Sequence, residues 1–410
     1  MTVPVNSSAR RVGAEPRSAP LRYVAVGVGA LVAMAQVAAD VVARGRLDPL
    51  YFDGGDYHRL AAGLAEHGVY GPPIANRPPG WPVLLAAVYR GVGIHPTAGL
   101  ALNVVLAGLA AALVVLLAGR LGLSPLGAGA AGLIAGLCPW SLVLGATLYT
   151  ETLYTLLVVL LALLVIGGRD RRAQVDWWAG IGLATGVGIL VRPQLVIWVP
   201  FALCFAFAGR RPAAALAFLG VIVLVLTPWA VRNYARLGSF VPLDTRGGET
   251  LAVANNDLSE GGQSIEGLPQ IPAGTEVEND RAYRSAAVQW ILADPLRFVG
   301  RMDDRLVRTF DPVTKLIHGT FGSVSQRWTV RVIWIILMAF VVWGLVLHHR
   351  GPWLVPISIV AATLLLVVGF GGGFRFLVPV VPFLSIWGVA GLTDVMTVRL
   401  QDHRPRGVAA

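Results

Sequence analysis

Acidic and basic side chains gather at a few places between the long apolar runs of this sequence. Asp53 and Asp56 directly follow the first run, in the stretch YFDGGDYHRLAAGL, and Glu151 opens a later one. Arginines stand at the ends of further runs, as Arg192, Arg232 and Arg375, and Arg77 lies in the connection after the first run. A carboxylate can take a proton from an attacking hydroxyl, and arginine binds anions through paired N–H donors. Brought together, these residues could bind an anionic head group beside a general base.

The composition around these residues indicates a membrane protein. The chain has 410 residues, of which 55% are hydrophobic and 14% charged, and its mean hydropathy is +0.67. A soluble domain carries about 25% charged residues. The formal net charge of +10 comes almost entirely from arginine, but the arginines are scattered between apolar segments. This scatter argues against nucleic-acid binding and favours contact with anionic lipids and a phosphate-bearing substrate.

The apolar runs predict an all-α polytopic membrane protein with about ten transmembrane helices. The runs cover residues 21–43, 97–119, 125–143, 150–168, 177–191, 193–208, 212–231, 329–347, 353–370 and 376–396. The first is too long for the core of a signal peptide and is interpreted as an uncleaved helix. The two runs between 177 and 208 are short and could form a hairpin of tilted helices.

Basic residues between the runs predict the orientation. They cluster at 120, 169–172, 210–211, 348–350 and 399–406, which the positive-inside rule places in the cytoplasm together with both termini. The arginine-, alanine- and glycine-rich composition suggests a bacterial source, and we therefore expect a multi-pass protein of the bacterial cell membrane. The expected domains are a disordered tail (1–20), a transmembrane domain (21–396) and a second cytoplasmic tail (397–410).

Two long connections, 44–96 and 232–328, then face the extracytoplasmic side. The first should hold a juxtamembrane helix from Gly55 to His67 and a second helix after Arg77-Pro-Pro-Gly80. The other should end in helices at about 278–293 and 296–310, the latter capped by Asp294 before a proline.

This topology brings the acids and the arginines to the outer face, where they could form a polar cavity. Each also has an ordinary structural explanation. Asp53 and Asp56 could cap the helix near Gly55, and Glu151 could complement a helix dipole. The arginines at 192, 232 and 375 could be interfacial anchors. His58 is interpreted as a helix-surface residue, and because no second histidine stands at ligand spacing, no metal site is predicted.

The order of these landmarks resembles the GT-C glycosyltransferases, in particular the bacterial group related to protein O-mannosyltransferases and lipid A aminoarabinose transferases. Asp53-Gly-Gly-Asp-Tyr57 is similar to the Asp-Glu-x-x-Tyr element of that family, and Arg77-Pro-Pro79 to its Lys/Arg-Pro-Pro element. Thr150-Glu151 and the runs LTPWAVRNYARLGSFVPLDTRGG and FRFLVPVVP also resemble landmarks of the group. The likeness extends from about residue 50 to 395. Gly54 replaces the family's second acid, and Asp56 could compensate from one turn away.

The resemblance implies a GT-C-like bundle that moves a hexose or pentose from a polyprenyl-phosphate donor to an extracytoplasmic lipid, polysaccharide or protein, with inversion. It implies Asp53 as the general base, with Asp56 as a possible stand-in and Glu151 orienting the acceptor or sharing the role. The implied binding residues are Arg77, Arg375 and Arg232 for the donor phosphate and Tyr57, Asn255 and Asn256 for the substrate. No cofactor is predicted, and dependence on a divalent cation stays open.

Two other functions are compatible with the same residues. A transporter or lipid flippase could line its path with them, although the sequence lacks the internal repeats frequent in transporters and its polar groups gather at one face rather than at mid-bilayer. A non-catalytic subunit of an envelope-synthesis complex would tolerate substitution of Asp53, Glu151 and Arg77.

Overall fold

The computed structural model describes residues 18–402, apart from 46, 73, 169–173, 209–211, 261, 272–273 and 314–323. These residues form α-helices, short 3₁₀ helices and connecting loops, and no strand occurs among them. The predicted all-α class is confirmed.

Among the described residues, six helices are long and apolar enough to span a membrane. Four of them are α1 (Ser18–Ala43), α4 (Pro96–Arg120), α10 (Pro212–Leu237) and α15 (Val324–Leu347). The other two are the stretches Gly351–Phe370, which contains α16 (Leu354–Phe370), and Phe374–Thr397, which contains most of α18 (Val381–Asp402). The pair α5 (Pro125–Gly136) and α6 (Pro139–Gly145), bent by 54°, can form a seventh span. Shorter apolar helices are α7 (Glu151–Gly167), α8 (Val175–Val191) and η2 (Pro193–Trp198) with α9 (Val199–Phe207). A helix therefore lies on every apolar run read from the sequence.

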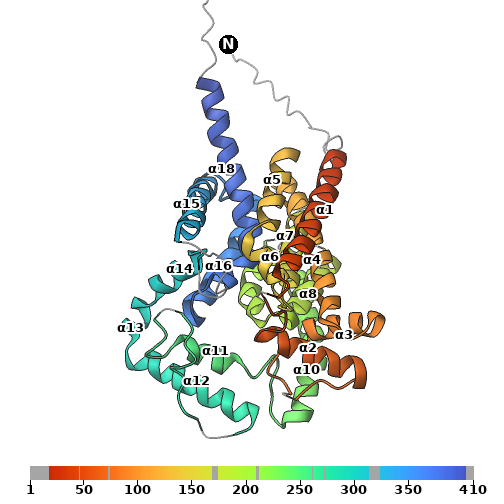
Figure 1. The fold of residues 1–410 in the computed structure, drawn as a ribbon, viewed down its shortest axis with the longest axis vertical. Coiled ribbons are helices and arrows are strands. Elements are labelled where there is room, and N and C mark those ends of the chain that lie inside the picture. The colour runs from red at the N-terminus through yellow and green to blue at the C-terminus, as the bar shows by residue number, and fades with distance from the viewer. Residues whose placement is uncertain are drawn as a thin grey trace, which may run out of the picture.

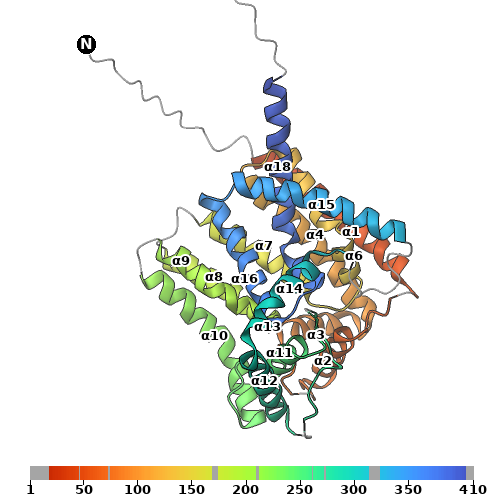
Figure 2. The ribbon, with the colours of Figure 1, turned by 90° about the vertical axis from the view of Figure 1, so that its left-hand side faces the viewer.

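The bundle is organised around α4, which contacts α1, α5 and α7. Small residues allow this close approach: a Cβ added at Gly29 of α1 would lie 2.9 Å from the backbone oxygen of Gly108 in α4. On one flank α8, α9 and α10 lie side by side (Figure 2), and α18 packs against α5 and α15. Figure 1 shows α18 projecting from one end of the bundle, while α2, α3, α11 and α12 gather at the other.

Local signals set the ends of the helices around this second group. The helix α2 (Asp53–His67) ends at Gly68, whose φ of 66° suits glycine. The helix α3 (Gly80–Val92) follows Arg77-Pro-Pro as predicted. We call the connections 44–96 and 232–328 the first and the large outer loop, after their predicted side. In the large outer loop, α11 (Gly247–Ala254) precedes α12 (Glu276–Ala293), which begins with a capping box between Thr275 and Glu278.

One predicted helix differs from the structure. The helix expected at 296–310 is broken at Arg301 into α13 (Pro295–Gly300) and α14 (Met302–Phe310), because Gly300 disfavours a continuous helix. Asp294 still caps α13 as predicted, accepting from the amide of Arg297 at 2.9 Å. The spans α10 and α18 continue to residues 237 and 402, past the predicted ends at 231 and 396.

The parts of the chain used for the orientation are described only incompletely. The tails at 1–17 and 403–410 and the arginine groups at 169–172 and 210–211 lie outside the described residues. The domain limits and the orientation therefore stay predictions.

One junction between the two long connections, 44–96 and 232–328, is built around Glu276. The Glu276 carboxylate accepts from the backbone amides of Ile74 and Ala75, the latter at 2.9 Å, and from the hydroxyl of Thr245 at 3.2 Å. The Thr245 amide donates in turn to the backbone oxygen of Ala75 at 2.9 Å. Arg77 lies two residues after Ala75. This junction therefore holds the loop that carries Arg77.

Candidate active site

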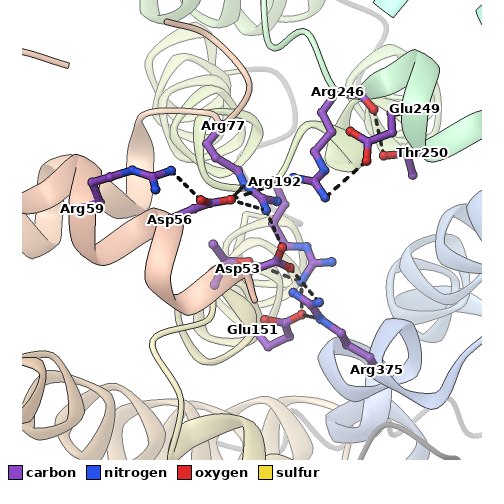
Figure 3. Close-up of polar contacts among 11 residues, drawn as sticks. Asp53, Asp56, Arg59, Arg77, Glu151, Arg192, Arg246, Glu249, Thr250 and Arg375 are labelled. Atoms are coloured by element: carbon purple, nitrogen blue, oxygen red, sulfur yellow. Dashed lines mark hydrogen bonds and ion pairs between the residues drawn. The ribbon is translucent and has the colours of Figure 1, made fainter. Parts of the chain in front are cut away.

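Three carboxylates and three arginines meet at the end of the bundle, beside the outer loops (Figure 3). We call Asp53, Asp56, Glu151, Arg77, Arg192 and Arg375 the acid–arginine cluster. They come from the first turns of α2 and α7, the loop before α3, the α8–η2 junction and the short helix α17 (Phe374–Leu377). Five of the predicted site residues are thus brought together.

Asp53 lies at the centre of the acid–arginine cluster. Its Oδ1 pairs with Arg77, and its Oδ2 pairs with Nη1 of Arg375 at 2.8 Å. Arg77 also contacts Asp56 Oδ2 at 2.9 Å. Both oxygens of Asp53 are therefore occupied by guanidinium groups.

Glu151 is the innermost member. Its Oε1 pairs with Nε of Arg375 and with Nη1 of Arg192, the latter at 2.6 Å. The exposed fraction of the side chain is 1% for Glu151, 16% for Asp53 and 25% for Asp56. The cluster thus runs from a buried carboxylate to a partly open one.

The backbone explains why this chain lacks an acid after Asp53. A Cβ added at Gly54 would overlap the backbone oxygen of Pro49, so no side chain fits there. That oxygen is held in place, because it accepts from the amide of Leu148 at 3.2 Å. Asp56 lies one helical turn after Asp53, on the same face of α2 as Asp53, and pairs with Arg77. The predicted compensation by Asp56 therefore has a geometric basis.

An aromatic ring supports each arginine of the cluster. The guanidinium carbon lies 5.3 Å from the Tyr57 ring centroid for Arg77, 5.5 Å from Tyr154 for Arg192 and 4.3 Å from Tyr149 for Arg375. Such cation–π contacts hold a cation without neutralising its charge. Tyr57 is buried beneath Arg77, so the structure gives it a supporting contact, and its predicted role in substrate binding stays a prediction.

The local charges decide the protonation of Asp53. Burial raises the pKa of this carboxyl, but the guanidinium groups of Arg375 and Arg77 outweigh burial and hold the pKa well below its usual range. Burial lowers the pKa of Arg77, and Asp53 more than restores it, so that this pKa lies above its ordinary value. The resting site therefore contains an ionised Asp53 that both arginines stabilise against protonation.

Two arginines of the site were not among the predicted donor-phosphate residues. Arg192 was predicted as a member of a polar cavity or as an interfacial anchor, and the structure pairs it with Glu151. Arg246 was missed: it lies at the rim, with Nη1 4.0 Å from Asp56 Oδ2 and Nη2 3.8 Å from Glu249 Oε1 (Figure 3). The one sequence feature that could have indicated Arg246 is its place in the run ending LDTRGG, which resembles a landmark of the family.

The structure does not bring Arg232 to the cluster. Its guanidinium donates to the backbone oxygens of Tyr70 and Ile74 and lies 4.7 Å from the ring centroid of Trp229. It thereby fastens the first outer loop to α10. A contact with the donor phosphate stays a prediction that the geometry does not favour.

The two asparagines also serve the loop in which they lie. Asn255 donates to the backbone oxygen of Gly369 at 3.1 Å and accepts from Arg305 at 2.9 Å. The Asn256 side chain donates to Ala252 and accepts from the amide of Leu258. These bonds occupy the amides, and binding of substrate by them stays a prediction.

The large outer loop positions Arg375 through the glycine turn before it. Gly371 has a φ of 91°, and a Cβ added at Gly372 would overlap the backbone oxygen of Arg305. The Gly373 amide donates to Oγ1 of Thr309 at 3.1 Å. The turn that leads into Arg375 is therefore packed against α14.

His58 contacts the hydroxyl of Tyr89 at 2.7 Å and lies outside the acid–arginine cluster. Within the described part of the chain, no group of three or more His, Cys, Asp or Glu side chains could hold a metal ion.

Comparisons with known proteins address the fold. Residues 76–231 match the family model described as dolichyl-phosphate-mannose-protein mannosyltransferase. No curated protein matches the chain. Among solved structures, the Archaeoglobus fulgidus oligosaccharyltransferase tethered with an acceptor peptide has a TM-score of 0.51 at 12% identity, covering 93% of this chain and 50% of that one.

Two further solved structures match less closely. The Archaeoglobus fulgidus oligosaccharyltransferase AglB, in complex with an inhibitory peptide and a dolichol-phosphate, has a TM-score of 0.48 at 11% identity, covering 95% of this chain and 53% of that one. ArnT from Cupriavidus metallidurans, bound to undecaprenyl phosphate, has a TM-score of 0.43 at 13% identity, covering 93% of this chain and 81% of that one.

This chain spans about half the length of the oligosaccharyltransferase, 50% of it in the tethered complex. The family match covers three members of the cluster, Arg77, Glu151 and Arg192. The resemblance read from the sequence is confirmed, and the protein has the fold of the GT-C glycosyltransferases.

Proposed function

We propose that the protein transfers a sugar from a polyprenyl-phosphate donor to an acceptor hydroxyl at the extracytoplasmic face of a bacterial cell membrane, with inversion. One observation carries the proposal: Asp53 is held at both oxygens by arginines that suit a phosphate equally well. The match to a family named for a dolichyl-phosphate-sugar donor supports it. The positive-inside pattern supports the orientation.

Charge balance indicates how a donor would enter the site. Three arginines and three carboxylates compensate each other in the acid–arginine cluster. A donor phosphate therefore competes with the carboxylates for Arg77 and Arg375 rather than filling an empty cationic site. Its two free oxygens match the paired donors of a guanidinium group. Because the donor enters laterally from lipid, a site at the end of a membrane bundle is well placed for it.

The same competition makes Asp53 a better base. When the arginines turn toward the phosphate, their effect on Asp53 weakens and its pKa rises from the depressed resting value. The added negative charge of the phosphate also favours uptake of one proton by the cluster. Asp53 would accept the proton of the acceptor hydroxyl, whose oxygen forms the new bond to the anomeric carbon.

The leaving group departs on the opposite side of the sugar. The bond between the anomeric carbon and the phosphate oxygen breaks, and polyprenyl phosphate leaves with the electron pair. Arg77 and Arg375 would stabilise the charge that develops on it. A single displacement of this kind inverts the anomeric configuration. The sugar would be a hexose or pentose, and the acceptor a glycolipid, a polysaccharide or a protein.

The test is transfer from labelled polyprenyl-phosphate sugars by membranes that contain Asp53→Asn. We expect turnover to fall about 10²- to 10⁴-fold, because the amide cannot take the proton. Asp176→Asn, at an exposed position in the first turn of α8, is the matched control. Wild-type turnover by a folded Asp53→Asn protein would remove the base assignment. Movement of the donor across the membrane of reconstituted vesicles, without transfer of the sugar to an acceptor, would instead indicate a flippase.

A further inference from the structure

A cavity adjoins the acid–arginine cluster on the side of the bundle interior. It is bounded by α1, α4, α5, α6, α7 and the start of α18, and it extends one turn along α7 from Glu151 to Thr155. The wall formed by α4 is apolar and includes Ala110 and Ala111. Gln36 of α1 and Glu151 also line this cavity.

Gln36 leaves an oxygen without a partner there. The side chain is fully buried, at 0% exposure. Its Nε2 donates to Oδ1 of Asp40 at 2.8 Å and to the backbone oxygen of Leu142 at 3.0 Å. Because both partners are acceptors, they fix the orientation of the amide. Oε1 then has no hydrogen-bond partner within the described chain.

Glu151 leaves a second such oxygen. Its Oε1 receives both Arg375 and Arg192, while the equally buried Oε2 has no partner among the described residues. Buried acceptors are normally satisfied, so two of them lining one cavity point to a ligand that donates hydrogen bonds. Two guanidinium groups already match the charge of Glu151, which favours a neutral donor such as a hydroxyl.

We propose that this cavity binds hydroxyl groups of the donor sugar through Oε1 of Gln36 and Oε2 of Glu151. The inference rests on the proposed function, which places the donor phosphate at Arg375. That arginine contacts the other oxygen of the same Glu151 carboxylate, so a sugar attached to the phosphate lies next to the cavity. Gln36 is then a residue that determines preference for the sugar and takes no part in the chemistry.

Binding of two probes to the full chain in lipid nanodiscs tests the proposal. One probe is bare polyprenyl phosphate, and the other is a panel of polyprenyl-phosphate hexoses and pentoses. The wild type should bind at least one sugar conjugate more tightly than the bare phosphate. Gln36→Leu should reduce that advantage about 3- to 10-fold and leave the affinity for bare phosphate unchanged, because it removes one hydrogen bond to the sugar.

A second variant protects the test against misfolding of the first. Ala111→Leu fills the cavity from the opposite wall without changing either unpartnered oxygen, and it should also abolish the sugar advantage. Ala101→Leu makes the same change at an exposed position of α4 and should behave as wild type.

The outcomes separate this inference from the proposed function. A sugar advantage kept by both cavity variants, or absent from the wild type with every sugar, would mean that the cavity holds water only and would overturn the inference. The proposed function would survive that result, since bare polyprenyl phosphate would still bind. Failure of the wild type to bind bare polyprenyl phosphate would overturn the proposed function and this inference with it.

Discussion

Arg375 and Arg305 lie close in the fold but use their guanidinium groups in opposite ways. Arg375 is paired with the carboxylates of Asp53 and Glu151. Arg305, which is 0% exposed, donates to the backbone oxygens of Val368, Gly369 and Ala254 and to Asn255 Oδ1. Burial lowers the pKa of Arg305 to about 10, and none of its described partners is a carboxylate.

The difference separates an exchangeable arginine from a structural one. A carboxylate partner can be replaced by a phosphate, which offers the same pair of oxygens. The carbonyl partners of Arg305 lie at the ends of α16 and α11, and releasing them would leave buried acceptors without a donor. Arg305 therefore holds the turn in front of Arg375, and Arg375 is free to change partners. Two substitutions of the same type should reveal this contrast.

Within this comparison, the largest expected effect is on turnover in Arg375→Gln. We expect a loss of about 10²- to 10³-fold, because a donor aimed at the leaving phosphate is removed. Thermal unfolding should change little, since Arg192 still pairs with Glu151 and Arg77 with Asp53. Arg327→Gln, at an exposed position of α15, is the control. Near-normal turnover by Arg375→Gln would assign Arg375 to structure.

Arg305→Gln should show the reverse pattern. Several buried carbonyls lose their donor, so the free energy of unfolding should fall by about 3 kcal/mol, measured by thermal unfolding in detergent. The fraction that remains folded should still bind polyprenyl phosphate. Arg308→Gln, one turn along α14 with a side chain 48% exposed, should unfold like the wild type. A stable Arg305→Gln protein that had lost donor binding would contradict the distinction.

A smaller effect is expected at Gly54. Gly54→Ala should cost about 1–3 kcal/mol of stability and lower turnover, because the new methyl group pushes α2 away from Pro49 and displaces Asp53. Gly91→Ala, where a Cβ meets no atom within 4 Å, is the matched control and should be neutral or stabilising. A Gly54→Glu protein with raised activity would show that the missing acid could be restored, against the steric argument.

The centre of the site could be predicted from the sequence. Asp53, Glu151 and Arg375 follow or precede apolar runs and Arg77 lies in the connection 44–96, and the predicted topology places all four on one side of the membrane. The cluster confirms that they meet. The length of the apolar runs likewise predicted a helix at each span.

The contacts that the sequence could not predict depend on packing between segments far apart in the chain. Arg192 and Arg232 both stand near a helix end, so the sequence does not distinguish them. Arg232 lies away from the acid–arginine cluster because its guanidinium donates to the backbone oxygens of Tyr70 and Ile74. Asn255 and Asn256 were predicted to bind substrate because the sequence does not show their hydrogen-bond partners. Arg305, which donates to Asn255, lies in a distant segment of the chain. The contact of Gly54 with Pro49 depends on a turn whose shape no motif indicates.

The most direct test of the exchange of arginine partners is the acid limb of the pH–rate profiles. The limb of kcat/KM for the donor reports the resting site, and the limb of kcat reports the donor complex. In the resting site the two arginines hold the pKa of Asp53 well below its usual range, so kcat/KM should lose no activity down to about pH 4. With donor bound the pKa rises, and kcat should fall at a higher pH as Asp53 becomes protonated. Acid limbs that coincide, or a kcat limb at the lower pH, would contradict the release of Asp53 by the donor phosphate.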